Sequence, residues 1–358
     1  MNKLGLIGAA SAAVWAAAVF AATAGAQVAT APAASRGGNP AENLPPNITQ
    51  LTWFGERPQF SLDGKRLAFM EKSFGDAFEI DLATKRIRLL THFPHQGFLR
   101  VHYLTNGDYL LVGARTFENV QKTRYSQQEL WVLKPGAREP IALNQKLTEG
   151  VAVSRKRNRI AWATDSRTHP GEVPERTALI HIADIVDQGG KPVLANKREV
   201  VRLTAPDCVG TEPQDFRNDD RELIFVCYTY DTAKKGIDGE IRGVGLTTGK
   251  ITSYLKVENE YDEPEGIYPD GRHILVESSR DLSTPTSKTL DIWKLRLDSN
   301  GRDMVRVTRF GDYEGFKASN PVVHDDGRTI AFQMGRGGDE TGVGYGIFVL
   351  KENGGAPR

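Results

Sequence analysis

The chain has 358 residues, of which 39% are apolar and 25% are charged, and its formal net charge is +1. This composition is ordinary for a soluble globular protein. A net charge so near zero gives no long-range attraction to polyanions, so binding to nucleic acid is not expected.

The first 26 residues have the pattern of a secretory signal peptide. Lys3 supplies a short positive region, an Ala-rich apolar stretch covers residues 4–24, and Ala24-Gly25-Ala26 forms a small-residue cleavage site. We therefore expect a periplasmic or secreted protein. An uncleaved membrane anchor is the alternative, because the stretch nearly reaches the roughly 20 residues that a span needs.

Residues 27–47 are rich in Ala, Pro, Gly and Asn and have no hydrophobic periodicity, which predicts a flexible tether. After residue 47 no segment is apolar enough to cross a bilayer, so we expect no transmembrane span once the signal is removed. The folded domain is predicted to cover residues 48–358.

One hairpin signature recurs six times along this domain. In its clearest copy, residues 60–69 (FSLDGKRLAF), an extended run meets Asp-Gly and an alternating apolar strand follows. Asp-Gly tolerates the positive φ angles of a tight turn, so it joins two antiparallel strands. The other copies are residues 103–112, 153–162, 216–225, 267–276 and 323–332. The copies at 153–162 and 216–225 have lost the turn glycine.

A third strand pattern follows each hairpin, and a fourth often follows it. Aromatic and aliphatic runs such as residues 129–133 and 291–295 predict a third strand, and segments ending in Leu-Thr, such as 88–91 and 201–204, predict a fourth. Four strands per unit at this period are typical of a propeller blade. The predicted fold is therefore an all-β, six-bladed β-propeller of four-stranded antiparallel blades. A β-sandwich is the competing fold, but it does not explain the repeat.

The two ends of the domain are predicted to share the last blade. Residues 50–55 (QLTWFG) match residues 306–311 (RVTRFG), the outer strand of the fifth repeat, whereas the sixth repeat has no outer strand of its own after Leu350. We expect residues 48–52 to supply it, because pairing the first and last segments in one blade removes an exposed sheet edge.

The strings FSLDGKRLAF, IYPDGRHILV and VHDDGRTIAF resemble the WD40-like (PD40) repeat of TolB-like periplasmic propellers. The resemblance covers roughly residues 48–350 and implies the propeller fold and a place in the cell envelope. That family includes binding proteins, and similar propellers precede peptidase domains or, more distantly, form metal-dependent oligogalacturonate lyases. The chain departs from TolB in having no room for a separate N-terminal α/β domain, so TolB's partners are not carried over.

Ligands of a propeller are expected at the channel mouth, in the loops that lead into the innermost strands. The position seven residues before each hairpin turn holds, in order, Glu56, Leu99, Glu149, Glu212, Glu263 and Ser319. Four glutamates in one ring predict a site for a hard cation such as Ca²⁺ or for a cationic ligand group. Solvated loop glutamates, paired with neighbours such as Arg57 and Lys317, are the alternative.

Other polar residues flank this ring. Arg57 and Arg100 lie one step further in, and Lys317 and Asn320 precede the last inner strand. Mixed charges of this kind fit a zwitterionic or sugar-acid ligand held by bidentate Arg contacts, or structural ion pairs between blades. Glu265 forms with Glu263 a carboxylate pair of the kind used in glycoside chemistry, although acidic residues beside turns are common.

Three histidines, His92, His95 and His102, lie close together in sequence and could bind a transition metal at the mouth, although their spacing matches no ligand motif. Cys208 and Cys227 are the only cysteines, and in an oxidising compartment we expect them to form a disulfide. Two buried thiols are the alternative. The one cofactor that these residues suggest is a divalent metal, either Ca²⁺ or a transition metal.

The sequence contains no GxSxG or GxxxxGK motif, so no reaction follows from it. Our leading hypothesis is an exported binding or scaffold protein that recognises an envelope protein or glycan through the channel mouth. The alternative is a propeller enzyme, a metal-assisted lyase or hydrolase acting on a saccharide or small polar substrate. A purely structural accessory subunit is a third interpretation.

Overall fold

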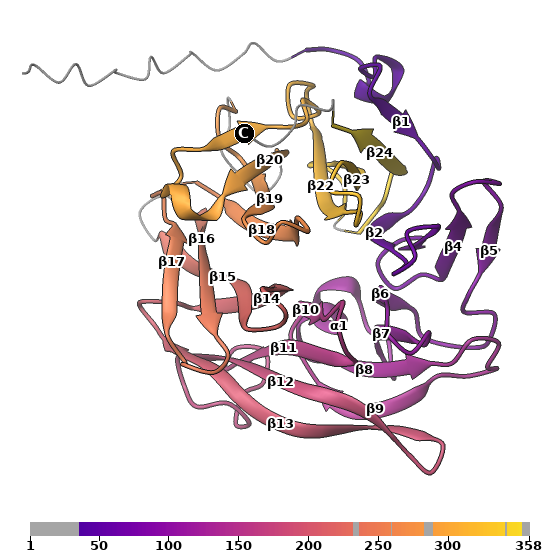
Figure 1. The fold of residues 1–358 in the computed structure, drawn as a ribbon, viewed down its shortest axis with the longest axis vertical. Helices are drawn as coiled ribbons and strands as arrows, with labels where there is room; N and C mark the ends of the chain where they lie inside the picture. The colour runs from indigo at the N-terminus through magenta and orange to yellow at the C-terminus, as the bar shows by residue number, and fades with distance from the viewer. Residues whose placement is uncertain (1–35, 232–235, 259, 283–288, 341, 353–358) are drawn as a thin grey trace, which may run out of the picture. The chain divides into compact units, whose positions relative to one another are not determined.

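The computed structural model describes residues 36–231, 236–258, 260–282, 289–340 and 342–352. This part of the chain forms six four-stranded antiparallel sheets, which are the blades of a propeller around one axis (Figure 1). The predicted fold class is confirmed.

Blades 1–5 use their strands in chain order from the axis outward, whereas blade 6 takes its outermost strand from the start of the domain. Blade 1 contains β2 (Glu56–Phe60), β3 (Arg66–Met70), β4 (Ala77–Asp81) and β5 (Ile87–Leu89). Blade 2 contains β6 (Phe98–Tyr103), β7 (Tyr109–Ala114), β8 (Gln128–Leu133) and β9 (Ile141–Lys146), with helix α1 (Val120–Ser126) between β7 and β8. Blade 3 contains β10 (Val151–Val153), β11 (Arg159–Asp165), β12 (Thr177–Gln188) and β13 (Lys191–Thr204).

The second half repeats this plan. Blade 4 contains β14 (Gly210–Arg217), β15 (Glu222–Asp231), β16 (Gly236–Gly245) and β17 (Ile251–Leu255). Blade 5 contains β18 (Asp262–Ile267), β19 (His273–Ser278), β20 (Asp291–Arg296) and β21 (Met304–Arg306). The 3₁₀ turn η2 (Leu297–Ser299) lies between β20 and β21. Blade 6 contains β22 (Phe316–Val323), β23 (Thr329–Arg336), β24 (Ile347–Lys351) and β1 (Ile48–Gln50).

All six predicted hairpins form the first two strands of a blade. In the clearest copy Gly64 has a φ of 66°, as the Asp-Gly turn requires, and Ser61 accepts the turn hydrogen bond from its amide at 2.8 Å. The copy at 216–225 lacks a glycine, and Asn218, Asp219 and Asp220 adopt positive φ in its place. Short polar side chains tolerate this region better than others do, which explains how the degenerate copy still turns.

The ring closes as the sequence predicts. Strand β1 pairs antiparallel with β24, in the register Ile48 with Leu350 and Gln50 with Phe348 (Figure 1). Ile48 is buried in the apolar cluster of blade 6 with Leu350 and Phe348. Closure therefore combines sheet pairing with burial of one aliphatic side chain.

The segment before β1 differs from the predicted tether. Residues 27–35 lie outside the described residues, but residues 36–47 contact the propeller. The Arg36 amide donates to the Asp312 carbonyl at 2.7 Å, the 3₁₀ turn η1 (Pro40–Glu42) is capped by Asn39, and Ala41 and Leu44 pack on the blade 6 cluster. The tether predicted for 27–47 is therefore too long at its C-terminal end, because apolar residues within it find a core to join. The signal peptide predicted for 1–26 also lies outside the described residues.

The hydrophobic core lies between neighbouring blades, where the faces of adjacent sheets meet. The cluster between blades 3 and 4 contains Phe216, Phe225 and both cysteines. Cys208 and Cys227 are joined by a disulfide in the structure, with Cα atoms 5.5 Å apart, and both are fully buried. None of the described helices is both long and apolar enough to cross a bilayer.

Candidate functional site

The innermost strands of all six blades start at the same end of the axis and surround a cavity of about 810 Å³, called here the mouth cavity. Five of the six predicted ring positions line it: Glu56, Glu149, Glu212, Glu263 and Ser319. The sixth, Leu99, is fully buried. Helix α1 and the end of β23 add rim residues such as Tyr125 and Arg336.

Irregular pairing sets which side chains reach the cavity. The first two strands of blades 1, 2, 4, 5 and 6 each contain a register shift close to the ring position. Such a bulge breaks the strict alternation of a strand, so neighbouring residues can face the same space. Arg57 and Asn320 lie in two of these bulges with φ angles of 52° and 47°, which non-glycine residues rarely adopt. Both residues line the mouth cavity.

Glu149 of blade 3 lies inside a group of three arginines, called here the arginine cluster. Arg57 donates to it at 3.1 Å, Arg124 of helix α1 donates at 2.6 Å, and Arg100 lies 4.0 Å away. Burial by itself raises the pKa of Glu149, but attraction to the three guanidinium groups outweighs burial and lowers it to about 2. Glu149 is therefore a counter-ion of the arginine cluster.

Glu56 also forms an ion pair with a neighbouring arginine. Its Oε1 accepts from Arg57 at 2.5 Å and from the Ser73 hydroxyl at 2.8 Å, and its exposed fraction is only 1%. The interpretation as solvated loop glutamates is wrong, because all four ring glutamates are buried. The expected pairing with Arg57 is present. Two of the four ring carboxylates are thus neutralised within blades 1–3.

Carboxylates dominate the opposite side of the mouth cavity. Glu263 accepts hydrogen bonds from Tyr228 at 2.8 Å, from Gln214 at 2.9 Å and from Tyr261. Burial, followed by repulsion from Glu277, raises the pKa of Glu263 to about 7, although the tyrosine hydrogen bonds oppose the increase. Burial and repulsion from its acidic neighbours likewise raise the pKa of Glu212 well above its usual value.

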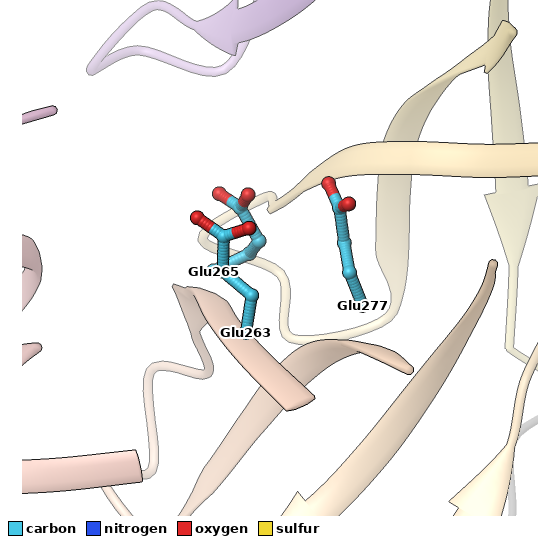
Figure 2. A group of neighbouring side chains, drawn as sticks. All are labelled: Glu263, Glu265 and Glu277. Carbon is cyan, nitrogen blue, oxygen red and sulfur yellow. The ribbon is translucent and has the colours of Figure 1, made fainter. Parts of the chain in front are cut away.

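Glu277 also lines the mouth cavity, and Glu265 lines a smaller pocket that shares Arg57, Arg100 and Asn320 with it. One carboxylate oxygen from each of Glu263, Glu265 and Glu277 lies within 4.8 Å of the other two, and we call these three residues the blade 5 carboxylates. Figure 2 shows the three carboxyl groups pointing in the same direction from β18 and β19. The Asn320 side chain lies 3.3 Å from both Glu265 and Glu277, and burial with like-charge repulsion raises the pKa of Glu265 well above its usual value.

The remaining predicted polar residue of the mouth is Lys317, which lines the cavity on blade 6. Burial lowers its pKa. The mouth therefore has two chemically different walls: the arginine cluster around Glu149 on blades 1–3, and the carboxylates of blades 4 and 5.

The structure does not bring the three predicted metal-binding histidines together. His92 is exposed, and His95 contacts Asp76 at 2.8 Å in a loop. His102 is buried beside the channel, where burial and the charge of Arg100 lower its pKa to about 3. Within the described residues, the one group of three potential metal ligands is the blade 5 carboxylates.

Sequence reasoning missed three residues of the site: Glu277, Arg124 and Tyr228. Glu277 lies on the second strand of its blade, directly opposite Glu263, so the alternation of β19 could have indicated it. Arg124 lies on an inserted helix that the repeat does not contain, and no local signal places it at the mouth.

No protein-family model matches the sequence, and no curated protein sequence matches it either. Among solved structures, TolB from Acinetobacter baumannii is 14% identical, with 85% of this chain and 67% of that chain covered and a TM-score of 0.44. A putative TolB from Agrobacterium tumefaciens is 13% identical, with 86% and 97% covered and a TM-score of 0.37.

A calcium-binding protein from Agrobacterium tumefaciens, regucalcin, is 13% identical, with 85% of this chain and 93% of that chain covered and a TM-score of 0.49. The six-bladed propeller predicted from the repeats is present in the sheet topology of the chain itself. Similarity at this level says nothing about a shared ligand or activity.

Proposed function

We propose that the chain is an exported binding protein that takes a charged polar group of an envelope partner into the mouth cavity, with an acidic sugar of an envelope glycan as the ligand class. The observation that carries this proposal is the arginine cluster in the wall of an 810 Å³ cavity. Cavities of about 300–1,000 Å³ are usual for small ligands.

The arginine cluster retains unused donors. The Nε groups of Arg57 and Arg100 are buried and have no hydrogen-bond partner among the described residues. A buried donor without an acceptor is unfavourable, and a ligand carboxylate would satisfy it through a charge-assisted hydrogen bond. The signal-peptide pattern of residues 1–26 supports a location where envelope glycans occur.

Calorimetric titration of the mature protein with glucuronate and with glucose tests the proposal. We expect binding of the acid only, and an affinity about tenfold or more lower in Arg100→Gln, since a hydrogen bond to a charged group contributes about 1.5–3 kcal/mol. Arg336→Gln, at the exposed rim, is the matched control. Equal binding of glucose, or unchanged binding by Arg100→Gln, would contradict an acid-specific site.

The enzyme alternative is favoured by a different feature, the buried Glu263 carboxyl group in the wall of the mouth cavity, whose pKa is raised to about 7 by burial and by repulsion from Glu277. A carboxyl group that titrates near neutral pH can serve as a general acid or base. Chromatography of uronate oligosaccharides incubated with the protein tests this function. Cleavage that Glu263→Gln abolishes supports the enzyme, and intact oligosaccharides support the binding protein.

A further inference from the structure

The blade 5 carboxylates place like charges opposite each other on neighbouring strands, which is unfavourable in a β-sheet. Glu263 and Glu277 are direct cross-strand partners on β18 and β19, and Glu265 lies in the bulge two residues further on. Like charges directly opposite each other destabilise a strand pair. All three side chains are at least nine-tenths buried, so water screens their repulsion poorly.

Their geometry fits one hard cation. Three carboxylate oxygens lie within 4.8 Å of one another. A Ca²⁺ ion binds oxygen at about 2.3–2.6 Å, so it can contact two oxygens that are up to about 4.6–5.2 Å apart. A ligand set that consists only of oxygen favours Ca²⁺, Mg²⁺ or Mn²⁺ over softer metals. Each pair of these oxygens is therefore close enough to share one ion, and a small side-chain adjustment brings all three to the Ca²⁺ distance.

An independent observation also indicates a missing ligand. Ser319, at the ring position of blade 6, is 3% exposed, and its hydroxyl has no hydrogen-bond partner among the residues the structure describes. It faces the mouth cavity that Glu263 and Glu277 line. Buried hydroxyls normally have a partner, and an oxygen with free lone pairs is a suitable ligand for a hard cation.

Neighbouring residues hold the carboxylates in place, as outer-shell partners do in metal sites. Tyr228 and Gln214 donate to Glu263, and the backbone amide of Asn320 donates to Glu277 at 2.5 Å. The Asn320 side chain bridges Glu277 and Glu265. The unusual backbone of Asn320, in the bulge of β22, is what brings both groups within reach.

We infer that the blade 5 carboxylates, with the Ser319 hydroxyl facing the same space, bind one divalent cation of the calcium type in the wall of the mouth cavity. The cation removes the repulsion across β18 and β19 and leaves coordination positions open toward the cavity. This site is distinct from the arginine cluster, so it can be tested without any organic ligand.

Calorimetric titration of chelator-treated mature protein with CaCl₂, MgCl₂ and MnCl₂ tests the inference. We expect one ion per chain and an affinity lower by about tenfold or more in Glu277→Gln. Glu340→Gln is the matched control, because Glu340 lines the same cavity but is exposed and lies outside the cluster. We expect its affinity to equal that of the unchanged protein.

Ser319→Ala removes a hydroxyl that forms no hydrogen bond with a described residue, so it should fold normally and bind the ion less tightly. This variant keeps the test decisive if Glu277→Gln does not fold. Absence of binding by all three ions, or equal affinity in Glu277→Gln, Ser319→Ala and the unchanged protein, overturns the inference. Binding of glucuronate with no metal binding would overturn the cation site and leave the proposed function intact.

Discussion

Arg124 and Glu149, 25 residues apart in the sequence, form a two-point ion pair at the channel mouth: Arg124 Nε donates to Glu149 Oε2 at 2.6 Å and Arg124 Nη2 donates to Oε1. The pair joins helix α1 of blade 2 to the residue that leads into β10 of blade 3. An inserted helix is thus anchored on the ring position of the next blade.

Arg124→Met should lower the free energy of unfolding by about 2–4 kcal/mol, because it removes the two-point partner of the buried Glu149 carboxylate and leaves only Arg57 and Arg100 to balance its charge. Lys146→Met is the control, since Lys146 and Glu172 form a pair in which both side chains are more than half exposed. Its effect should stay below about 1 kcal/mol. Urea denaturation measures the free energy of unfolding of both variants. Equal decreases would show that the buried Arg124–Glu149 pair contributes no more to stability than the exposed Lys146–Glu172 pair.

Asp215 should make stability depend on pH in mildly acidic solution. Burial raises its pKa to about 6, while the Ile267 amide, Arg155 and the Phe216 amide oppose the increase and Asp220 adds to it. Because the folded pKa is raised, the contribution of Asp215 to stability is complete below about pH 4 and is lost as the pH rises through 6.

A shift of this size corresponds to at most about 3 kcal/mol, and solvent in the 70 Å³ cavity that Asp215 lines reduces it. We expect the unchanged protein to lose stability relative to Asp215→Asn between pH 4 and pH 7. Denaturation of both proteins with chelator present measures the difference. A difference that is constant with pH would contradict the raised pKa.

The disulfide between Cys208 and Cys227 spans 19 residues. Replacing both cysteines by alanine should lower the free energy of unfolding by about 3 kcal/mol, because the bond restricts the unfolded chain. Mass spectrometry of the secreted protein after thiol alkylation, with and without prior reduction, tests whether the bond forms. Alkylation without reduction would show two free thiols instead.

Strand β1 should contribute to stability through one side chain. Ile48 is buried in the blade 6 cluster, whereas Thr49, the next residue, is exposed. Ile48→Ala should cost about 2–4 kcal/mol and Thr49→Ala less than about 0.5 kcal/mol. Thermal unfolding of the two variants distinguishes them, and similar midpoints would mean that closure rests on backbone pairing alone.

The fold was predictable because its information is local and repeated. The Asp63-Gly64 turn specifies a hairpin by itself, and five related copies specify the blade number. Even the register of closure followed from the match between residues 50–55 and 306–311. The docking of residues 36–47 was not predictable, because it depends on where the blade 6 core presents a surface for Leu44.

The site was predictable only in part. The position seven residues before each hairpin turn correctly indicated four carboxylates at the channel mouth. This worked because the inner strands have similar lengths and begin at the same end of the axis. It could not assign their roles: Arg124 comes from an insertion, and the bulges decide which neighbours of Glu56 or Glu263 turn toward the cavity. The prediction that His92, His95 and His102 lie together was based on their proximity in sequence, and it was wrong. His92 and His95 lie in the loop between β5 and β6, whereas His102 lies on β6 beside the channel.

The shared last blade also affects how the protein reaches its native state. The Lys351 amide donates to the Asn47 carbonyl at 2.9 Å, and the Asn47 side chain returns a bond to Lys351, across 304 residues. Contacts at such sequence separation give a high contact order and slow folding. We expect the first five blades to assemble from successive hairpins, whereas blade 6 must bring β1 and β24 together from distant parts of the chain. Ring closure is then a late folding step, and until β1 pairs, the outer edge of β24 is open to pairing with another chain.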